Sequence, residues 1–153
     1  MTGFAYSHLG ICVSDLERSL RFYCDGLGFE KAESYPIGPE FGAALEVPGE
    51  LQLTSQFIRR DGVAIELLHY TSPGAIGTPS AARNQLGITH LSFIVDDVDA
   101  SAAQLVAAGG TVLDDTRTDL GIQILFLADP DGTRIELMGG AGKIGRASCR
   151  ERV

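Results

Sequence analysis

The chain has 153 residues, enough for one compact domain or two small fused modules. Its 44% hydrophobic and 21% charged residues are typical of a soluble globular protein, and no apolar run approaches the ~20 residues of a membrane span. The formal net charge of −8 argues against nucleic-acid binding, because phosphates demand clustered Lys and Arg. The N-terminus lacks the basic start and apolar stretch of a secretory signal, so we expect a cytoplasmic protein without a membrane partner. Cys12, Cys24 and Cys149 show no CxxC spacing and fit free thiols in a reducing compartment.

The first half of the chain predicts a strand, a helix and three further strands. Residues 6–13 alternate between apolar and polar side chains, as in a half-buried strand. Ser14 followed by Glu17 is a capping-box signal for a helix that stops near Gly26. The remaining elements are strands over 29–35, 51–59 and 63–69, a short helix over 39–45, and a hairpin turn at Asp61-Gly62.

The second half predicts the same order of elements after a linker over 71–87, which is rich in Ser, Pro, Gly and Asn. Its elements are a strand over 88–95, a helix over 98–108, and strands over 111–117, 122–128 and 133–138. Each half is therefore predicted as βαβββ. We expect a first module over 1–70 and a second module over 88–142, in an α+β fold.

Two blocks of self-similarity relate the halves. The segment His-Leu-Gly-Ile-Cys-Val at 8–13 returns as His-Leu-Ser-Phe-Ile-Val at 90–95, 82 positions later. The segment Asp-Gly-Val-Ala-Ile-Glu-Leu at 61–67 returns as Asp-Gly-Thr-Arg-Ile-Glu-Leu at 131–137, 70 positions later. The difference between the two offsets predicts an insertion between the helix and the last strand of the first half.

The last eleven residues, 143–153, differ from the rest of the chain. They hold four basic residues and one acidic residue in an otherwise acidic protein. The string KIGRASCRERV can also be encoded, without a mismatch, by a short-read sequencing adapter. We therefore predict that 143–153 is a non-native tail, and finding its codons in genomic DNA would refute this interpretation.

Four polar side chains interrupt apolar strands at equivalent positions of the repeat: His8 and Glu66 in the first half, His90 and Glu136 in the second. One such residue alone is ordinarily exposed or satisfied within a core. Carboxylates that face one cavity, however, require a cation or a proton. Two imidazoles and two carboxylates suit one divalent ion, namely Zn, Ni, Co, Mn or Fe. The pattern thus predicts a metal site, whereas His69 is turned away from Glu66 and Tyr70 and Arg134 are expected at the rim.

The stretches HLGICVSDLERSLRFY and DPDGTRIEL resemble the vicinal oxygen chelate superfamily, over about residues 6–138. This family includes glyoxalase I, methylmalonyl-CoA epimerase, extradiol dioxygenases and fosfomycin or bleomycin resistance proteins. The resemblance implies that the two modules form a curved mixed sheet whose cleft closes around the metal and a small-molecule substrate, within one chain or across a homodimer.

The His/Glu/His/Glu set is most similar to glyoxalase I, which implies a metal-dependent lyase or isomerase. The resemblance implies proton transfer next to a carbonyl through a metal-bound enolate, with Glu136 as the base and Glu66 as second ligand and proton partner. The alternatives are an acyl-CoA epimerase like that for methylmalonyl-CoA, a protein that sequesters a small molecule, and an extradiol dioxygenase. The fourth ligand, Glu66, counts against the dioxygenase.

Two positions depart from glyoxalase I. That family usually has an Arg four residues beyond the first His, where this chain has Cys12, and an Asn four residues beyond the first Glu, where it has Tyr70. Because both family residues serve the glutathione moiety, the resemblance leaves the substrate open among a glutathione hemithioacetal, an acyl-CoA and another carbonyl compound.

Overall fold

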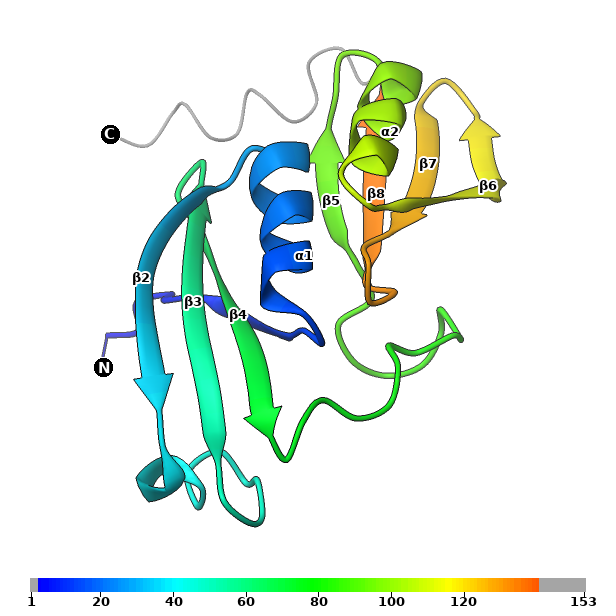
Figure 1. Cartoon of the computed structure of the whole chain (residues 1–153). Coiled ribbons are helices and arrows are strands. Elements are labelled where there is room, and N and C mark those ends of the chain that lie inside the picture. Colours follow the sequence, from blue (N-terminus) through cyan, green and yellow to red (C-terminus); the bar gives the residue numbers. More distant parts are fainter. Residues whose placement is uncertain (1–2, 141–153) are drawn as a thin grey trace. The chain divides into compact units, whose positions relative to one another are not determined.

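The computed structural model describes residues 3–140, and the tail predicted at 143–153 lies outside them. The described residues fall into two compact units that divide between Gly77 and Thr78 (Figure 1). Each unit is a mixed sheet of four strands with helical structure on one face, which confirms the predicted α+β fold of two βαβββ halves.

The first unit has the strand order β1-β4-β3-β2. β1 runs parallel to β4, and the other neighbours are antiparallel. Its elements are β1 (Leu9–Cys12), α1 (Leu16–Leu20), the π-helical turn η1 (Arg21–Gly26), β2 (Glu30–Ile37), the 3₁₀ helix η2 (Pro39–Phe41), β3 (Gln52–Arg60) and β4 (Val63–Ser72). The extra residues of this half lie between β2 and β3, as the repeat offsets predict.

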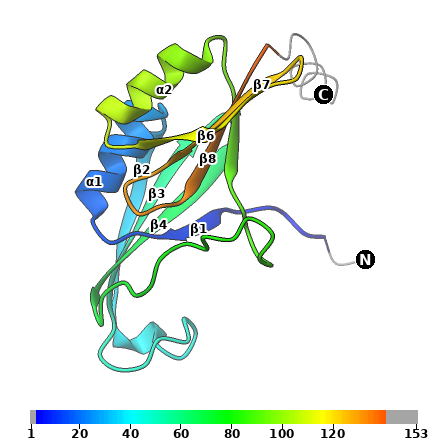
Figure 2. The same cartoon turned by 90° about the vertical axis from the view of Figure 1, so that its right-hand side faces the viewer.

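The second unit repeats this topology with the order β5-β8-β7-β6, and β5 is parallel to β8. Its elements are β5 (Leu91–Ile94), α2 (Val98–Ala107), β6 (Thr111–Asp119), β7 (Gln123–Ala128) and β8 (Arg134–Gly139). Figure 2 shows α2 lying along one face of this sheet.

One face of each sheet is covered and the other is more open. In β8, Ile135 and Leu137 are 0% and 1% exposed. The alternate residues of this strand, Arg134, Glu136 and Met138, are only partly buried. The same alternation of a two-residue period holds in β4 around Ile65 and Leu67. The apolar face packs under the helix, so the polar residues of these strands are left on the opposite face.

An Asp caps the N-terminus of each helix, and in the first helix it takes the place of the predicted Ser14. The Asp15 carboxylate accepts a hydrogen bond from the backbone N–H of Arg18 at 2.9 Å, and Asp97 accepts one from Ala100 at 2.9 Å. The predicted capping box at Ser14 and Glu17 is therefore wrong. Ser14 accepts instead from the Arg18 side chain at 2.8 Å, because Asp15 offers a charged acceptor one residue closer to the helix.

Strand ends differ from the predictions by a few residues. β1 and β5 begin at Leu9 and Leu91, later than the predicted 6 and 88. β4 continues to Ser72, two residues into the predicted linker, where Ser72 still pairs with Gln52. The β3–β4 hairpin has Asp61 and Gly62 at φ of 51° and 77°, the left-handed conformations that a type I′ turn needs.

The helices of residues 3–140 are short. None of them is long and apolar enough to cross a membrane.

The apolar layer of β8 should carry much of the second unit's stability. We expect Leu137→Ala to lower the free energy of unfolding by about 2–5 kcal/mol, because it leaves a cavity in the core. Leu120→Ala is the matched control: Leu120 is 87% exposed, and its loss should change stability by no more than about 0.5 kcal/mol. Chemical denaturation of both variants measures the difference, and equal effects would show that this layer is not the core.

Candidate functional site

The first unit brings His8 and Glu66 together on the open face of its sheet. The parallel pairing of β1 with β4 sets Gly10 opposite Glu66. His8 precedes Gly10 by two residues and therefore lies on the same face of the sheet. The His8 Nε2 and Glu66 Oε2 atoms are 3.1 Å apart. Their side chains are 34% and 18% exposed, so the carboxylate is largely shielded while the imidazole remains accessible.

The second unit forms the same pair from the equivalent residues. Ser92 is opposite Glu136, and His90 lies one rung away. The distance from His90 Nε2 to Glu136 Oε2 is 3.4 Å, with side chains that are 34% and 14% exposed. The two predicted His/Glu pairs thus have the same geometry, although the residues in each are 58 and 46 positions apart (66 − 8 and 136 − 90).

Each imidazole is oriented by two neighbours that the sequence analysis missed. Nδ1 lies 2.8 Å from the hydroxyl of the preceding residue, Ser7 or Thr89, so Nε2 faces the carboxylate. Each ring also contacts a phenylalanine edge-to-face, with centroids 5.1 Å apart for Phe57 and 5.3 Å for Phe126. The detectable signal was the recurrence of a hydroxyl residue before each His.

The carboxylates are held by serines that are not equivalent in the repeat. Ser55 of β3 donates its hydroxyl to Oε1 of Glu66. Ser92 of β5 donates to Oε2 of Glu136 at 2.6 Å, the same oxygen that faces His90. Gly10 is the equivalent of Ser92 in the first unit. It lies opposite Glu66 in register and has no side chain that could donate a hydrogen bond to the carboxylate. Glu66 is therefore bound at both oxygens, and neither contact of Glu136 uses Oε1.

The spacing within each pair fits a shared cation. Two ligand atoms about 2.1 Å from one ion, at tetrahedral or octahedral angles, are separated by about 3.0–3.4 Å. The observed 3.1 and 3.4 Å fall within that range. Among residues 3–140, no three His, Cys, Asp or Glu side chains gather as a metal-binding group, so each unit presents one His/Glu pair.

Tyr70 and His69 lie on opposite faces of β4. Tyr70 is an even number of residues from Glu66 along β4, so the two share a face, and His69 between them turns to the other face, in agreement with the alternation in the sequence. Burial raises the pKa of Tyr70, and the neighbouring Cys12 and Glu66 raise it further.

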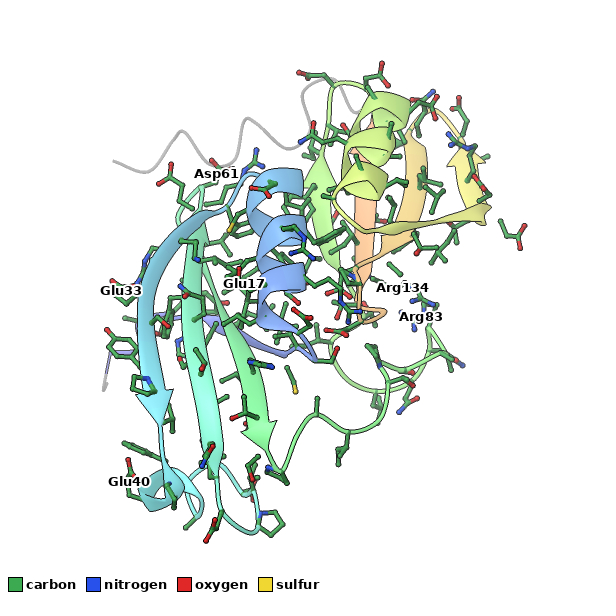
Figure 3. The ribbon with its side chains drawn as sticks, in the orientation of Figure 1. Glu17, Glu33, Glu40, Asp61, Arg83 and Arg134 are labelled. Atoms are coloured by element: carbon green, nitrogen blue, oxygen red, sulfur yellow. The ribbon has the colours of Figure 1, made fainter. Side chains whose placement is uncertain are left out.

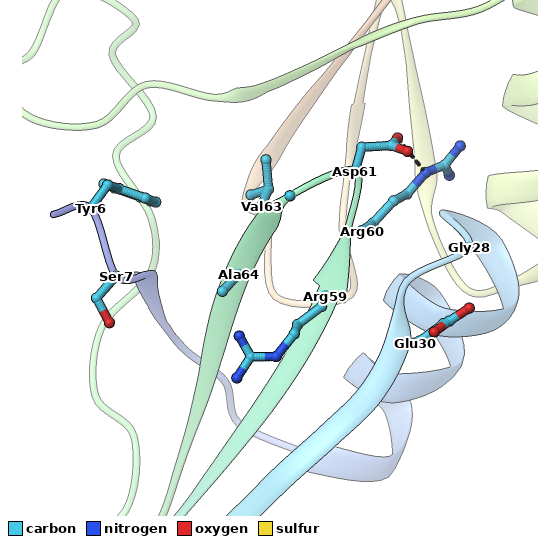
Figure 4. A pocket seen from close by; sticks show the side chains of 10 residues that line it. Tyr6, Ser7, Gly28, Glu30, Arg59, Arg60, Asp61, Val63 and Ala64 are labelled. Carbon is cyan, nitrogen blue, oxygen red and sulfur yellow. Dashed lines mark hydrogen bonds and ion pairs between the residues drawn. The ribbon is translucent and has the colours of Figure 1, made fainter. Parts of the chain in front are cut away.

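A hollow of about 720 Å³ opens beside the His8 pair in the first unit (Figure 4). Ser7, Arg59 and Ala64 line it on the side of the pair. Arg60 and Asp61, joined by an ion pair of 3.1 Å, line it at the hairpin.

The chain is similar to known proteins over nearly its whole described length. Residues 5–137 match the family model "Glyoxalase/Bleomycin resistance protein/Dioxygenase superfamily". The chain is 33% identical to the uncharacterized protein YaeR of Escherichia coli, over 85% of this chain and 92% of that protein. It is 31% identical to a probable lactoylglutathione lyase of Synechocystis (89% and 95%) and 31% identical to an ethylmalonyl-CoA/methylmalonyl-CoA epimerase of Cereibacter sphaeroides (86% and 94%).

Solved structures share the fold. A glyoxalase family protein from Bacillus cereus superposes with a TM-score of 0.76 at 17% identity, over 91% of this chain and 95% of that one. The fosfomycin resistance protein FosX from Listeria monocytogenes, crystallised with Mn(II) and sulfate, gives a TM-score of 0.56 at 18% identity, over 92% and 93%. At these identities the likeness concerns the fold alone.

Proposed function

Because the chain belongs to the glyoxalase/bleomycin resistance protein/dioxygenase superfamily, we propose that it is a metal-dependent lyase or isomerase that moves a proton next to a substrate carbonyl. The observation that carries this proposal is the His/Glu pair built twice, once in each unit, with 3.1 and 3.4 Å between nitrogen and oxygen.

The proposed ligands are His8 and Glu66 with His90 and Glu136. Their two neutral imidazoles and two carboxylates match the charge of a divalent ion such as Zn, Ni, Co, Mn or Fe. When bound, such an ion polarises the carbonyl oxygen and stabilises the negative charge that develops there. The fixed imidazole orientation, set by Ser7 and Thr89, prepares the ligands in advance. The two pairs would meet either within one chain or between the two chains of a homodimer, and both arrangements stay predictions.

Glu136 is the better base of the two glutamates. Its Oε1 takes part in neither contact of the carboxylate and is therefore available to accept a proton from the substrate. Glu66 is bound at Oε1 by Ser55 and at Oε2 by His8, so it is better suited to act as a fixed ligand and secondary proton partner. The proton would leave the carbon next to the carbonyl, reside on Glu136, and return to the substrate.

The names of the relatives suggest two substrate classes. The lactoylglutathione lyase supports a glutathione hemithioacetal, and the epimerase supports an acyl-CoA. Cys12 and Tyr70 stand on the face of the site where glutathione-binding residues would be expected, which favours the acyl-CoA alternative. Both reactions use the same proton transfer, so the chemistry proposed here does not depend on this choice.

The metal site is tested first by metal content. We expect about one divalent ion per chain in the purified protein, and its loss from His8→Ala, because one of four ligands is removed. His69→Ala is the matched control, since it removes the histidine on the other face of β4 and should leave the metal in place. Elemental mass spectrometry measures both. An unmodified protein that takes up none of Ni, Co, Zn, Mn or Fe would favour a small-molecule-sequestering protein instead.

The proton transfer is tested at Glu136. Glu136→Gln should slow exchange of the proton next to a substrate carbonyl by about 10²–10⁴-fold, because the amide is not a base. Deuterium incorporation from heavy water, followed by NMR with hemithioacetal and acyl-CoA substrates, measures the rate. Asp99→Asn removes an exposed carboxylate of the same unit and serves as the control. A rate of proton exchange in Glu136→Gln equal to that of the unmodified protein would show that another group is the base.

The support of Glu66 by Ser55 is tested by affinity. Ser55→Ala removes the hydroxyl that holds Oε1 and should weaken metal binding by about 10–100-fold, a typical cost of losing such a partner. Competition with a coloured chelator measures the dissociation constant. Ser34→Ala, which removes a serine hydroxyl from the exposed strand β2, should bind metal as the unmodified protein does. Equal affinities in both variants would show that the Ser55 contact does not prepare the ligand.

A further inference from the structure

In both units, an arginine belongs to the row of residues that lie side by side with the histidine across the strands of the sheet. The arginine is on a different strand in each unit. In the first unit, β1–β4 pairing continues from Leu9↔Ile65 to His8 beside Ala64, and Ala64 pairs with Arg59. In the second unit, pairing continues from Leu91↔Ile135 to His90 beside Arg134, and Arg134 pairs with Ala128. The arginine and the alanine thus stand in opposite order in the two units. In the second unit the arginine is next to the histidine.

The first of these arginines is occupied. The Arg59 guanidinium forms an ion pair of 2.6 Å with Glu33 of β2 and lies 5.8 Å from the centre of the Phe57 ring. Both side chains of the ion pair are 51% exposed. Arg59 therefore lies toward the outer strand, with its charge matched.

The second arginine has a different environment. Arg134 donates to the backbone carbonyl of Gly132 at 2.8 Å, and within residues 3–140 no carboxylate lies within ion-pair distance of it. The side chain is partly buried on the open face, two residues before Glu136, and Figure 3 shows it at the start of β8. A guanidinium has five N–H donors, so several remain for a ligand.

Resting on the proposed function, we propose that Arg134 binds a carboxylate of the substrate, close to the carbon from which Glu136 removes a proton. Arg134 and Glu136 are alternate residues of β8, about 7 Å apart along the strand, so a substrate that contacts both would carry its carboxylate a few bonds from the reacting carbon. The planar guanidinium matches a carboxylate through two parallel hydrogen bonds. The site thus selects carbonyl compounds that carry a nearby carboxylate.

Two small ketones test this assignment in the zinc-loaded protein: levulinate, with a carboxylate close to its carbonyl, and its uncharged methyl ester. We expect levulinate to bind about tenfold or more tightly, as is usual for a hydrogen bond to a charged group. Arg134→Gln should reduce the preference to within about twofold. Arg117→Gln is the matched control, because Arg117 is an arginine of the same unit that pairs with Asp99 at 2.8 Å, and it should keep the preference. NMR titration followed at backbone amide signals gives the dissociation constants in all three proteins, and the side-chain N–H signal that disappears in Arg134→Gln should shift when levulinate binds to the unmodified protein.

The two proposals fail in different ways. The absence of any preference for levulinate, including the absence of binding by either ketone, overturns the role of Arg134, as does a preference that persists in Arg134→Gln. Zinc content is measured on the same samples, and Arg134→Gln should retain its zinc because Arg134 is not a ligand. Failure of the unmodified protein to hold zinc counts against the metal site, while the levulinate titration still decides the assignment of Arg134.

Discussion

The site depends on the parallel pairing of the first and last strands of each unit. Parallel strands need a crossover, here the helix and two intervening strands, so residues distant in sequence become neighbours. The register is fixed because the opposite faces of β4 and β8 are buried, and a slip of one residue would turn Glu66 and Glu136 into the apolar layer. The hydrophobic core therefore determines the geometry of the polar pairs, and the same core built twice determines it twice.

Because the framework is built twice, the two units can keep the same His/Glu pair and still differ in the residues that hydrogen-bond to its glutamate. A serine hydroxyl reaches each glutamate, but from β3 in the first unit and from β5 in the second. Such a substitution costs little when it preserves a donor for a shielded carboxylate, because a carboxylate without one would be unfavourable. The result is a fixed Glu66 and a Glu136 with one oxygen outside these contacts, which is a physical basis for dividing the roles of ligand and base.

Much of this was predictable from sequence, and the omissions have physical causes. The repeat located the two His/Glu pairs, the order of elements along each half and the insertion, since all of these leave periodic traces in the chain. Phe57 and Ser55 left none, because a cross-strand neighbour depends on register, which spacing alone does not give. The start of the first helix was misplaced because Ser14 and Asp15 are both good caps, and only the backbone conformation shows which carboxylate or hydroxyl faces the first turn.

The exchange of arginine and alanine between strands is the largest chemical difference between the half-sites. In the first unit the guanidinium is moved one strand outward, where Glu33 matches its charge, and the rung beside His8 is left small. In the second unit the guanidinium stays beside His90 without such a partner among the described residues. A metal ion and an unmatched guanidinium both attract anionic oxygens, and the potential of the two charges adds. Under the proposed function, the second unit is then the half whose arginine would orient a charged substrate.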